Sequence, residues 1–167
     1  MADPDADFAA YFAARVSAVR RLAYALCGDW HTADDLVQAT FVKVYPRWRR
    51  VHGPAVDGYV RRVLVNTYLS HLRKHRREQI VADVPDVAVA GPERVAGPAS
   101  HDDLGPALRR LPPQQRAVVV LRHLEDLSVA EVAELMQVAP GTVKSQSARG
   151  IAALRASLSS SKEHDRA

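Results

Sequence analysis

The sequence has few of the features that would place a protein in a membrane or outside the cell. Its 167 residues include a single cysteine, Cys27, so neither an internal disulfide nor a Cys-x-x-Cys metal pair can form. No apolar run approaches the roughly 18 residues that a membrane-spanning helix needs. The first residues are acidic, whereas a secretory signal peptide begins with basic residues. We therefore expect a soluble cytoplasmic protein without membrane insertion.

Groupings typical of catalysis are also missing. No nucleophile beside a base, phosphate-binding glycine loop or pair of carboxylates stands out. His71 and His75 share a helical face, but basic residues surround them, and zinc sites usually need three or four ligands. Cys27 stands at the end of a predicted helix, where a small core residue is expected. The sequence therefore predicts a protein that is not an enzyme and that uses no metal or cofactor.

Positive charge is present, and it is unevenly distributed along the chain. Residues 1–78 contain 13 Lys and Arg against 8 Asp and Glu, residues 79–103 contain 1 against 5, and residues 104–167 contain 9 against 6. Two basic segments flanking an acidic one favour two nucleic-acid-facing modules with a spacer between them. A basic balance is also common in soluble proteins without such a partner, so charge alone leaves both interpretations open.

The first basic segment shows helical periodicity and no strand alternation. An apolar stripe over residues 8–26, at steps of three and four, predicts a long helix that Gly28 ends. Thr32, followed three residues later by an aspartate, resembles a capping box and predicts the start of a second helix. A third helix is expected over residues 57–77. These patterns predict an all-helical module.

The acidic segment, residues 79–103, has a different composition. It contains three prolines, two glycines, no aromatic residue and no sustained hydrophobic period. A structureless stretch of this length is unusual inside a compact domain. We therefore expect a flexible acidic linker between two small domains, which span residues 1–78 and 104–167.

The second basic segment is helical in pattern as well. A short helix over residues 104–111 is followed, after two prolines, by another helix. Ser128 and Glu131 form a capping box ahead of a third helix. After a turn at residues 137–140, a fourth helix is expected to continue to about residue 158. The whole chain is therefore expected to be all-α.

The last two of these helices, with the tight turn between them, describe a helix-turn-helix. Ala133 stands where the helices must approach closely and Val138 where the turn needs an apolar side chain, which favours DNA reading over a plain hairpin. Ala139 occupies the expected N-cap position, where Ser, Asp or Asn would serve better. Gln pairs with adenine, Arg or Lys with guanine, and hydroxyls with phosphate or base. The candidate DNA-reading residues are Thr142, Lys144, Ser145, Gln146 and Arg149.

Motifs in both modules resemble one family. Three segments of the second module, beginning at Leu111 (LPPQQR), Leu127 (LSVAEVA) and Gly141 (GTVKS), are similar to the C-terminal promoter-reading domain of extracytoplasmic-function sigma factors. In the first module, the segment beginning at Ala33 (ADDLVQATF) resembles that family's polymerase-docking motif. The resemblance spans nearly the whole chain in the family's order, and within the family the chain is similar to the actinobacterial sigma-E-like subfamily.

A further segment, residues 59–66 followed by Arg73, resembles the part of the family that reads the upstream edge of the opened promoter. Here the sequence departs from the family pattern, which usually has Trp where Tyr59 stands and Asp where Ser70 stands. In the second module, Gln146 follows Ser145 where the family more often has Arg. These departures point to changed packing in the first case and to a distinct base preference in the second.

The resemblance implies that the motif at Ala33 docks on the coiled-coil clamp of the largest subunit of bacterial RNA polymerase. Its acidic, apolar and amide groups lie on neighbouring turns of one predicted helix, which suits a basic amphipathic partner. The two carboxylates near the helix start also complement its dipole, and the two apolar residues are equally suited to the core, so these alternatives stay open. The candidate core-polymerase-binding residues are Asp34, Asp35, Leu36, Gln38 and Phe41.

The resemblance also implies that the first module holds unpaired bases of the −10 promoter element, one of them flipped into the loop at 51–57. Aromatic side chains beside cationic ones suit this task. Core packing explains Trp48 or Tyr59 equally well, whereas four cations within residues 73–77 favour DNA contact over a solvated helix end. The candidate residues are Trp48, Tyr59, Arg61, Arg62, Asn66, Arg73, Lys74, Arg76 and Arg77.

The sequence is thus identified as similar to sigma factors, the subunits that give bacterial RNA polymerase its promoter choice. The first module would bind the polymerase core and open the −10 element, and the second would read the −35 element as duplex DNA. The implied partners are core RNA polymerase, promoter DNA and an anti-sigma factor. Two alternatives stay open: an autonomous helix-turn-helix regulator that binds duplex DNA without polymerase, and an adaptor that binds polymerase without touching promoter bases.

Overall fold

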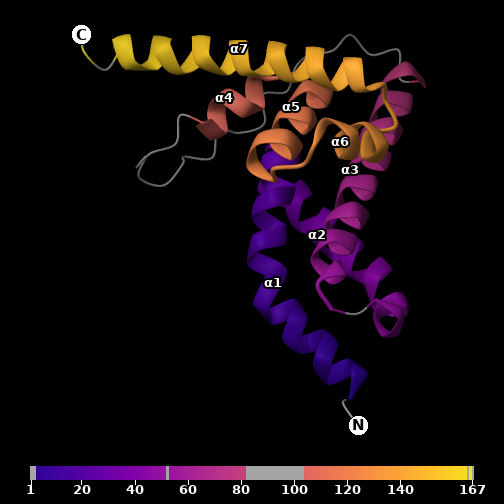
Figure 1. Cartoon of the computed structure of the whole chain (residues 1–167). Coiled ribbons are helices and arrows are strands. Elements are labelled where there is room, and N and C mark those ends of the chain that lie inside the picture. The colour runs from indigo at the N-terminus through magenta and orange to yellow at the C-terminus, as the bar shows by residue number, and fades with distance from the viewer. Residues whose placement is uncertain (1–2, 52, 82–103, 165, 167) are drawn as a thin grey trace.

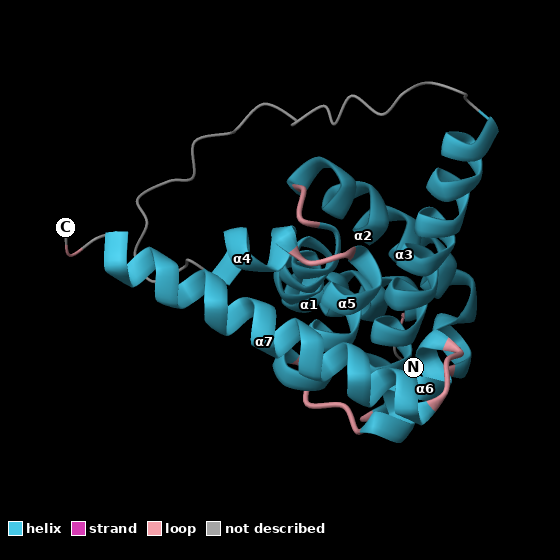
Figure 2. Ribbon diagram, turned by 90° about the horizontal axis from the view of Figure 1, so that it is seen from above, coloured by secondary structure: helices cyan, strands magenta, loops and turns pink. Residues whose placement is uncertain are grey.

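A computed structural model describes residues 3–51, 53–81, 104–164 and 166, and every regular element among them is helical (Figures 1 and 2). The prediction of an all-α fold is therefore confirmed. None of the helices in these ranges is both long and apolar enough to cross a lipid bilayer. Most of the expected acidic linker, residues 82–103, lies outside the described part of the chain.

The helices of the first module begin and end at recognisable capping residues. The Asp3 carboxylate caps the first helix by accepting a hydrogen bond from the Asp5 backbone N–H. Gly28 ends this helix, as expected, in the left-handed conformation (φ 76°). The elements are α1 (Pro4–Cys27), α2 (Trp30–Val44), the short 3-10 helix η1 (Tyr45–Arg50) and α3 (Ala55–Val81).

The start of α2 differs from the sequence-based expectation. Asp29 is the N-cap, and its carboxylate accepts hydrogen bonds from both the backbone N–H and the hydroxyl of Thr32, each at 2.8 Å. These bonds hold the pKa of the Asp29 carboxyl below its ordinary value. The prediction that Thr32 caps this helix is therefore wrong. Asp29 is the N-cap because it has the extended backbone that this position requires, and Thr32 donates hydrogen bonds to its carboxylate.

The second module follows its local signals closely. Ser128 accepts a hydrogen bond from the Glu131 backbone N–H at 3.1 Å and donates its own N–H to the Glu131 carboxylate at 2.7 Å, which confirms the capping box. The last helix continues beyond its expected end near residue 158. The elements are α4 (Leu104–Arg110), α5 (Pro113–Val119), the π-helical turn η2 (Val120–Leu124), α6 (Val129–Met136) and α7 (Pro140–His164).

Each module has buried apolar side chains at its centre, and those of the two modules form one continuous hydrophobic cluster. In the first module α1 and α3 pack on α2, and in the second α5 and α6 pack on α7. Figure 1 shows α4, α5 and α6 between α7 and the first module, and α4 and α5 contact α1 while α6 contacts α3. Burial of these apolar faces drives the packing within and between the modules. The most deeply buried side chains include Leu26, Leu64, Tyr68, Leu121, Val132 and Val143.

Candidate polymerase and nucleic-acid interfaces

The exposed side of α2 carries an acidic residue, an amide and an apolar residue on successive turns. Asp35, Gln38 and Val42 are spaced by three and four residues, so they form one stripe along the helix. Val42 is 66% exposed, so its apolar side chain is available to a partner. Sequence reasoning missed Val42, because only the structure shows which side of α2 packs against the core and that this valine lies on the opposite side. We call Asp35, Gln38 and Val42 the α2 stripe.

Two other residues of the predicted docking motif face inward. Leu36 and Phe41 are buried in the core of the first module. The Phe41 ring meets the rings of Phe8 and Phe12 edge to face, with centroids 6.2 and 4.8 Å apart. Of the two possibilities left open for these residues, the structure shows core packing.

Asp34 is engaged by its own chain. Its carboxylate pairs with the guanidinium of Arg20 on α1, and this hydrogen bond lowers the pKa of Asp34. Arg20 in turn lies 4.3 Å from the ring centroid of Trp30, and Trp30 stacks on Tyr24 with ring centroids 4.0 Å apart. The side chain of Asp35, by contrast, is exposed and lies 4.0 Å from His31. Asp35 is thus better placed than Asp34 for a partner.

The predicted promoter segment forms the exposed side of α3. Val60, Leu64 and Tyr68 turn into the core, while the opposite side of the helix is polar. A groove of about 330 Å³ between α2 and α3 is lined by Asp35, Lys74 and seven further residues. It therefore connects the α2 stripe to the four cations within residues 73–77, which we call the basic run. The exposed candidates on α3 are Arg62, Asn66, Arg73, Lys74, Arg76 and Arg77.

Two arginines of α3 contact carboxylates of the second module. Arg61 Nε donates to Glu125 Oε2 at 2.8 Å, and Arg62 donates to Glu134 Oε1 at 3.0 Å. Glu125 follows η2 and Glu134 lies on α6. These contacts join residues that are far apart in sequence, and no local pattern could have indicated them.

The two aromatic candidates lie deeper than the arginines. Trp48 is only 8% exposed, its indole N–H donates to the Asp7 carboxylate at 3.1 Å, and its ring packs against Phe8 and Tyr11. Tyr59 is half-buried against the core. The structure therefore places Trp48 in the core, one of the two positions left open for it, and leaves part of Tyr59 accessible.

The helix-turn-helix is formed by α6 and α7. Gln137 ends α6 with a left-handed backbone (φ 55°), and the Ala139 carbonyl accepts hydrogen bonds from Thr142 and Val143 at 2.9 and 3.2 Å. Val143 and two further residues of α7, Gly150 and Leu154, are buried against the module. This packing turns the polar side of the first turns of α7 outward.

The predicted DNA-reading residues share that outward side. Lys144, Ser145 and Arg149 are exposed, and Thr142 and Gln146 are half-buried. Ammonium, hydroxyl, guanidinium and amide groups are thus brought together on about two turns of one helix. This is the set of donors and acceptors that reads base edges in a major groove.

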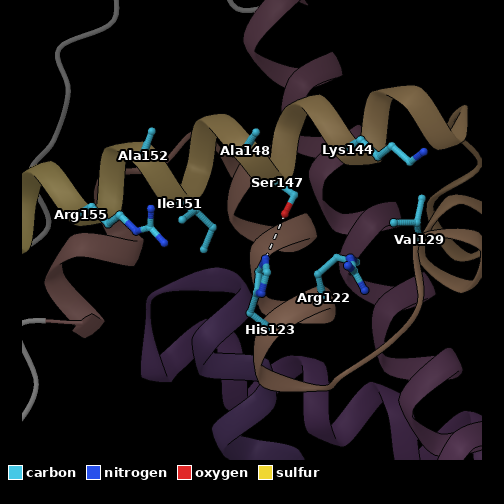
Figure 3. A pocket seen from close by; sticks show the side chains of 9 residues that line it. All are labelled: Arg122, His123, Val129, Lys144, Ser147, Ala148, Ile151, Ala152 and Arg155. Carbon is cyan, nitrogen blue, oxygen red and sulfur yellow. Dashed lines mark hydrogen bonds between the residues drawn. The ribbon is translucent and has the colours of Figure 1, made fainter.

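A groove of about 450 Å³ runs beside these turns (Figure 3). Arg122 and His123 of η2 face α7 across it, and His123 Nε2 lies 3.0 Å from Ser147 Oγ. Lys144 and Arg155 of α7 line the same groove, so its lining combines cations with apolar side chains such as Val129 and Ile151. Sequence reasoning missed Arg122 and Arg155, because Arg122 precedes the helix-turn-helix and Arg155 lies beyond the first turns of α7. Arg122 is half-buried and donates to the Leu127 backbone carbonyl at 2.6 Å, whereas Arg155 is exposed, so Arg155 is the more accessible cation of the two.

Comparisons with known proteins agree with this geometry. Residues 11–78 match the family model of sigma-70 region 2, and residues 101–154 match that of sigma-70 region 4. The chain is 37% identical over 157 residues to the RNA polymerase sigma-E factor of Streptomyces avermitilis, covering 92% of this chain and 86% of the relative. It is 34% identical over 154 residues to the sigma-E factor of Streptomyces coelicolor, covering 91% and 86%.

A solved structure is similar over nearly the same length. The sigma factor RpoE from Bartonella quintana, crystallised in complex with the anti-sigma factor NepR, matches with a TM-score of 0.67 and 27% identity, covering 92% of this chain and 97% of that chain. This chain therefore belongs to the extracytoplasmic-function sigma factors of the sigma-70 family, with a region 2 domain followed by a region 4 domain. Sigma factors are non-enzymatic subunits that direct RNA polymerase to promoters, so the prediction of a non-enzymatic sigma factor is confirmed.

Proposed function

We propose that this sigma factor docks on core RNA polymerase through the α2 stripe. The observation that carries this proposal is the exposure of Val42 beside Asp35 and Gln38, since the buried Leu36 and Phe41 are left to hold the helix in place. An apolar residue flanked by an acid and an amide suits a basic amphipathic helix. Asp35→Arg should abolish co-purification with core polymerase without unfolding the chain, and Glu163→Arg, at an exposed position of α7, serves as the control.

In the same proposal, α3 holds the opened −10 element and the first turns of α7 read the −35 element. The basic run of α3 supplies cations for the strand, and Arg61, Arg62 and Asn66 supply groups nearer the first turns of the helix. On α7, Lys144 and Arg149 are the residues that most directly suit guanine. The acidic segment that follows α3 would tether the two domains, so that two weak contacts reinforce each other on polymerase.

In vitro transcription from a promoter library with purified core polymerase tests this division of labour. The wild-type chain should select templates with a common upstream and a common downstream element. Lys144→Ala with Arg149→Ala should remove selection for the upstream element only, whereas Lys162→Ala, in the last turns of the same helix, should leave both. Unchanged upstream selection in the double variant would point to an adaptor. Tight duplex binding by the chain alone would point to an autonomous regulator.

We further propose that an anti-sigma factor holds this chain inactive in the cytoplasm, where RNA polymerase acts. The support is the likeness to RpoE, which was crystallised with its anti-sigma factor. A purified partner that forms an equimolar complex with the chain and blocks reconstituted transcription would support this proposal. Full transcriptional activity of all the chain present in cell extract would contradict it.

A further inference from the structure

The π-helical turn η2 contacts both ends of the helix-turn-helix through two consecutive side chains. Arg122 Nη1 donates to the Leu127 carbonyl at 2.6 Å, and Leu127 directly precedes the N-cap of α6. His123 Nε2 lies 3.0 Å from Ser147 Oγ on α7 (Figure 3). π-Helical turns are rare and are frequently found at functional sites. The contact of His123 with α7 is therefore a candidate for a functional role.

We propose that His123 is a positioning residue for promoter reading, which acts by holding Ser147 and thereby fixing the rotation of α7. The inference rests on the proposed role of the first turns of α7 in reading the −35 element. Ser147 directly follows Gln146 and precedes Arg149 by two residues, so a bond to Ser147 holds the helix within the candidate reading turns. His123 acts through Ser147 and not through a base.

The reading turns of α7 have little other support on the side that faces η2. Ala139 precedes the helix and has no polar side chain that could cap the first turn. A groove of about 450 Å³ separates η2 from α7. Among the residues that the structure describes, His123 and Ser147 make the only hydrogen bond between these two elements. The tight packing of α7 on α5 lies further along, at Gly150.

A small rotation of α7 is enough to change its base contacts. A helix with its side chains has a radius of about 5–6 Å, so a rotation of about 10° moves the tip of a side chain by about 1 Å. Hydrogen bonds to base edges operate over a range of only about 0.5 Å, so a shift of that size removes a contact made by Gln146 or Arg149. A bond that resists this rotation therefore contributes to selectivity without touching DNA.

The first measurement is a competition between two templates in one transcription reaction, with core polymerase and a limiting amount of the chain. One template carries the upstream element that the wild type enriches from the promoter library, and the other carries the same bases in scrambled order. His123→Ala and Ser147→Ala should each lower the ratio of the two transcripts about two- to tenfold. A general loss of stability would lower both transcripts alike and leave the ratio unchanged.

Matched controls are available on the distal part of α7. His164→Ala and Ser159→Ala make the same two chemical changes at exposed positions of that helix, and both should keep the wild-type ratio. The ring of His123 is exposed as well, so its removal leaves no cavity in the core. An unchanged ratio in both His123→Ala and Ser147→Ala would overturn the proposal.

A double-mutant cycle distinguishes positioning from direct DNA contact. The variant His123→Ala/Ser147→Ala should lose no more than either single variant, because both changes break the same bond. His123→Gln should recover most of the wild-type ratio, because its side-chain amide can also bond to the serine hydroxyl. Losses that add in the double variant would show that His123 contacts DNA itself, and they would overturn the proposal. A glutamine variant that behaves like the alanine variant would do the same.

Nuclear magnetic resonance tests the contact without DNA or polymerase. In the ¹⁵N-labelled chain, the ring signals of His123, assigned by their loss in His123→Gln, should shift in Ser147→Ala, whereas those of His164 should not. Unshifted His123 signals would refute the inference while leaving the proposed function intact. If the signals shift as expected but the wild type enriches no upstream element, the proposed reading by α7 fails instead.

Discussion

Gly150 of α7 lies directly against the Val119 side chain of α5, with no space for a β-carbon between the two helices. Because Gly150 follows the candidate reading residues on the same helix, this close approach fixes their position relative to the rest of region 4. The position thus links the packing of region 4 to its reading of DNA.

Gly150→Ala should destabilise the chain. Forcing a methyl group into this contact costs about 1–3 kcal/mol, which a helix-propensity gain of about 1 kcal/mol offsets only in part. Urea unfolding of the full chain measures the change. Gly141→Ala is the matched control, since Gly141 lies on the same helix with open space around it, and it should be neutral or stabilising. Equal stability of the two alanine variants would contradict the packing argument.

Val42→Asp should weaken binding to core polymerase on the order of tenfold, because it removes an exposed apolar contact and adds a charge there. The unfolding midpoint should stay close to that of the wild type, since Val42 is largely exposed. The measurement is the fraction of the chain that co-purifies with core enzyme at increasing salt concentration. Ala18→Asp, which places the same carboxylate on exposed α1, should bind normally. Normal binding by Val42→Asp would show that Val42 does not contact polymerase.

Trp48→Phe distinguishes the core role of this residue from a role in DNA binding. The change removes the indole N–H that donates to Asp7 and leaves a gap in the aromatic cluster, so we expect a loss of about 1–2 kcal/mol in unfolding free energy. Trp30→Phe, at an exposed ring, should cost less. Promoter opening per folded molecule should be unchanged in Trp48→Phe. A stable variant that fails to open promoters would assign Trp48 to the DNA instead.

Acid should remove the contribution of the capping box. The Ser128 backbone N–H lowers the pKa of Glu131, so the folded state favours the carboxylate. Its stabilising effect is present above the ordinary carboxyl pKa and is lost as pH falls through the lowered value. Near pH 7, Glu131→Ala should therefore have a lower melting temperature than the wild type. The difference between the two melting temperatures should decrease towards about pH 3. A difference between Glu131→Ala and wild type that does not change with pH would exclude this linkage.

Local signals were sufficient for much of the fold. Gly28 and the Ser128–Glu131 capping box are decided by residues within one turn, and both appear where the sequence predicts them. The start of α2 was harder, because Asp29 and Thr32 both suit an N-cap. Only the backbone conformation decides between them.

The site depends more on tertiary packing than on local sequence. Leu36 and Val42 are both apolar residues of α2, and which of them faces a partner is settled by the side of the helix that meets α1 and α3. The pair of Arg61 with Glu125 forms only because region 4 folds back on region 2. No periodicity in either segment carries that information.

α7 is one uninterrupted helix from Pro140 to His164, and its 25 residues span roughly 37 Å at about 1.5 Å per residue. Its contacts with α4, α5 and α6 hold the helix along its length, and they include the tight contact at Gly150. A substitution that shifts α7 at that contact shifts a helix that also carries the candidate reading residues. The position of those residues therefore depends on side chains that touch no base.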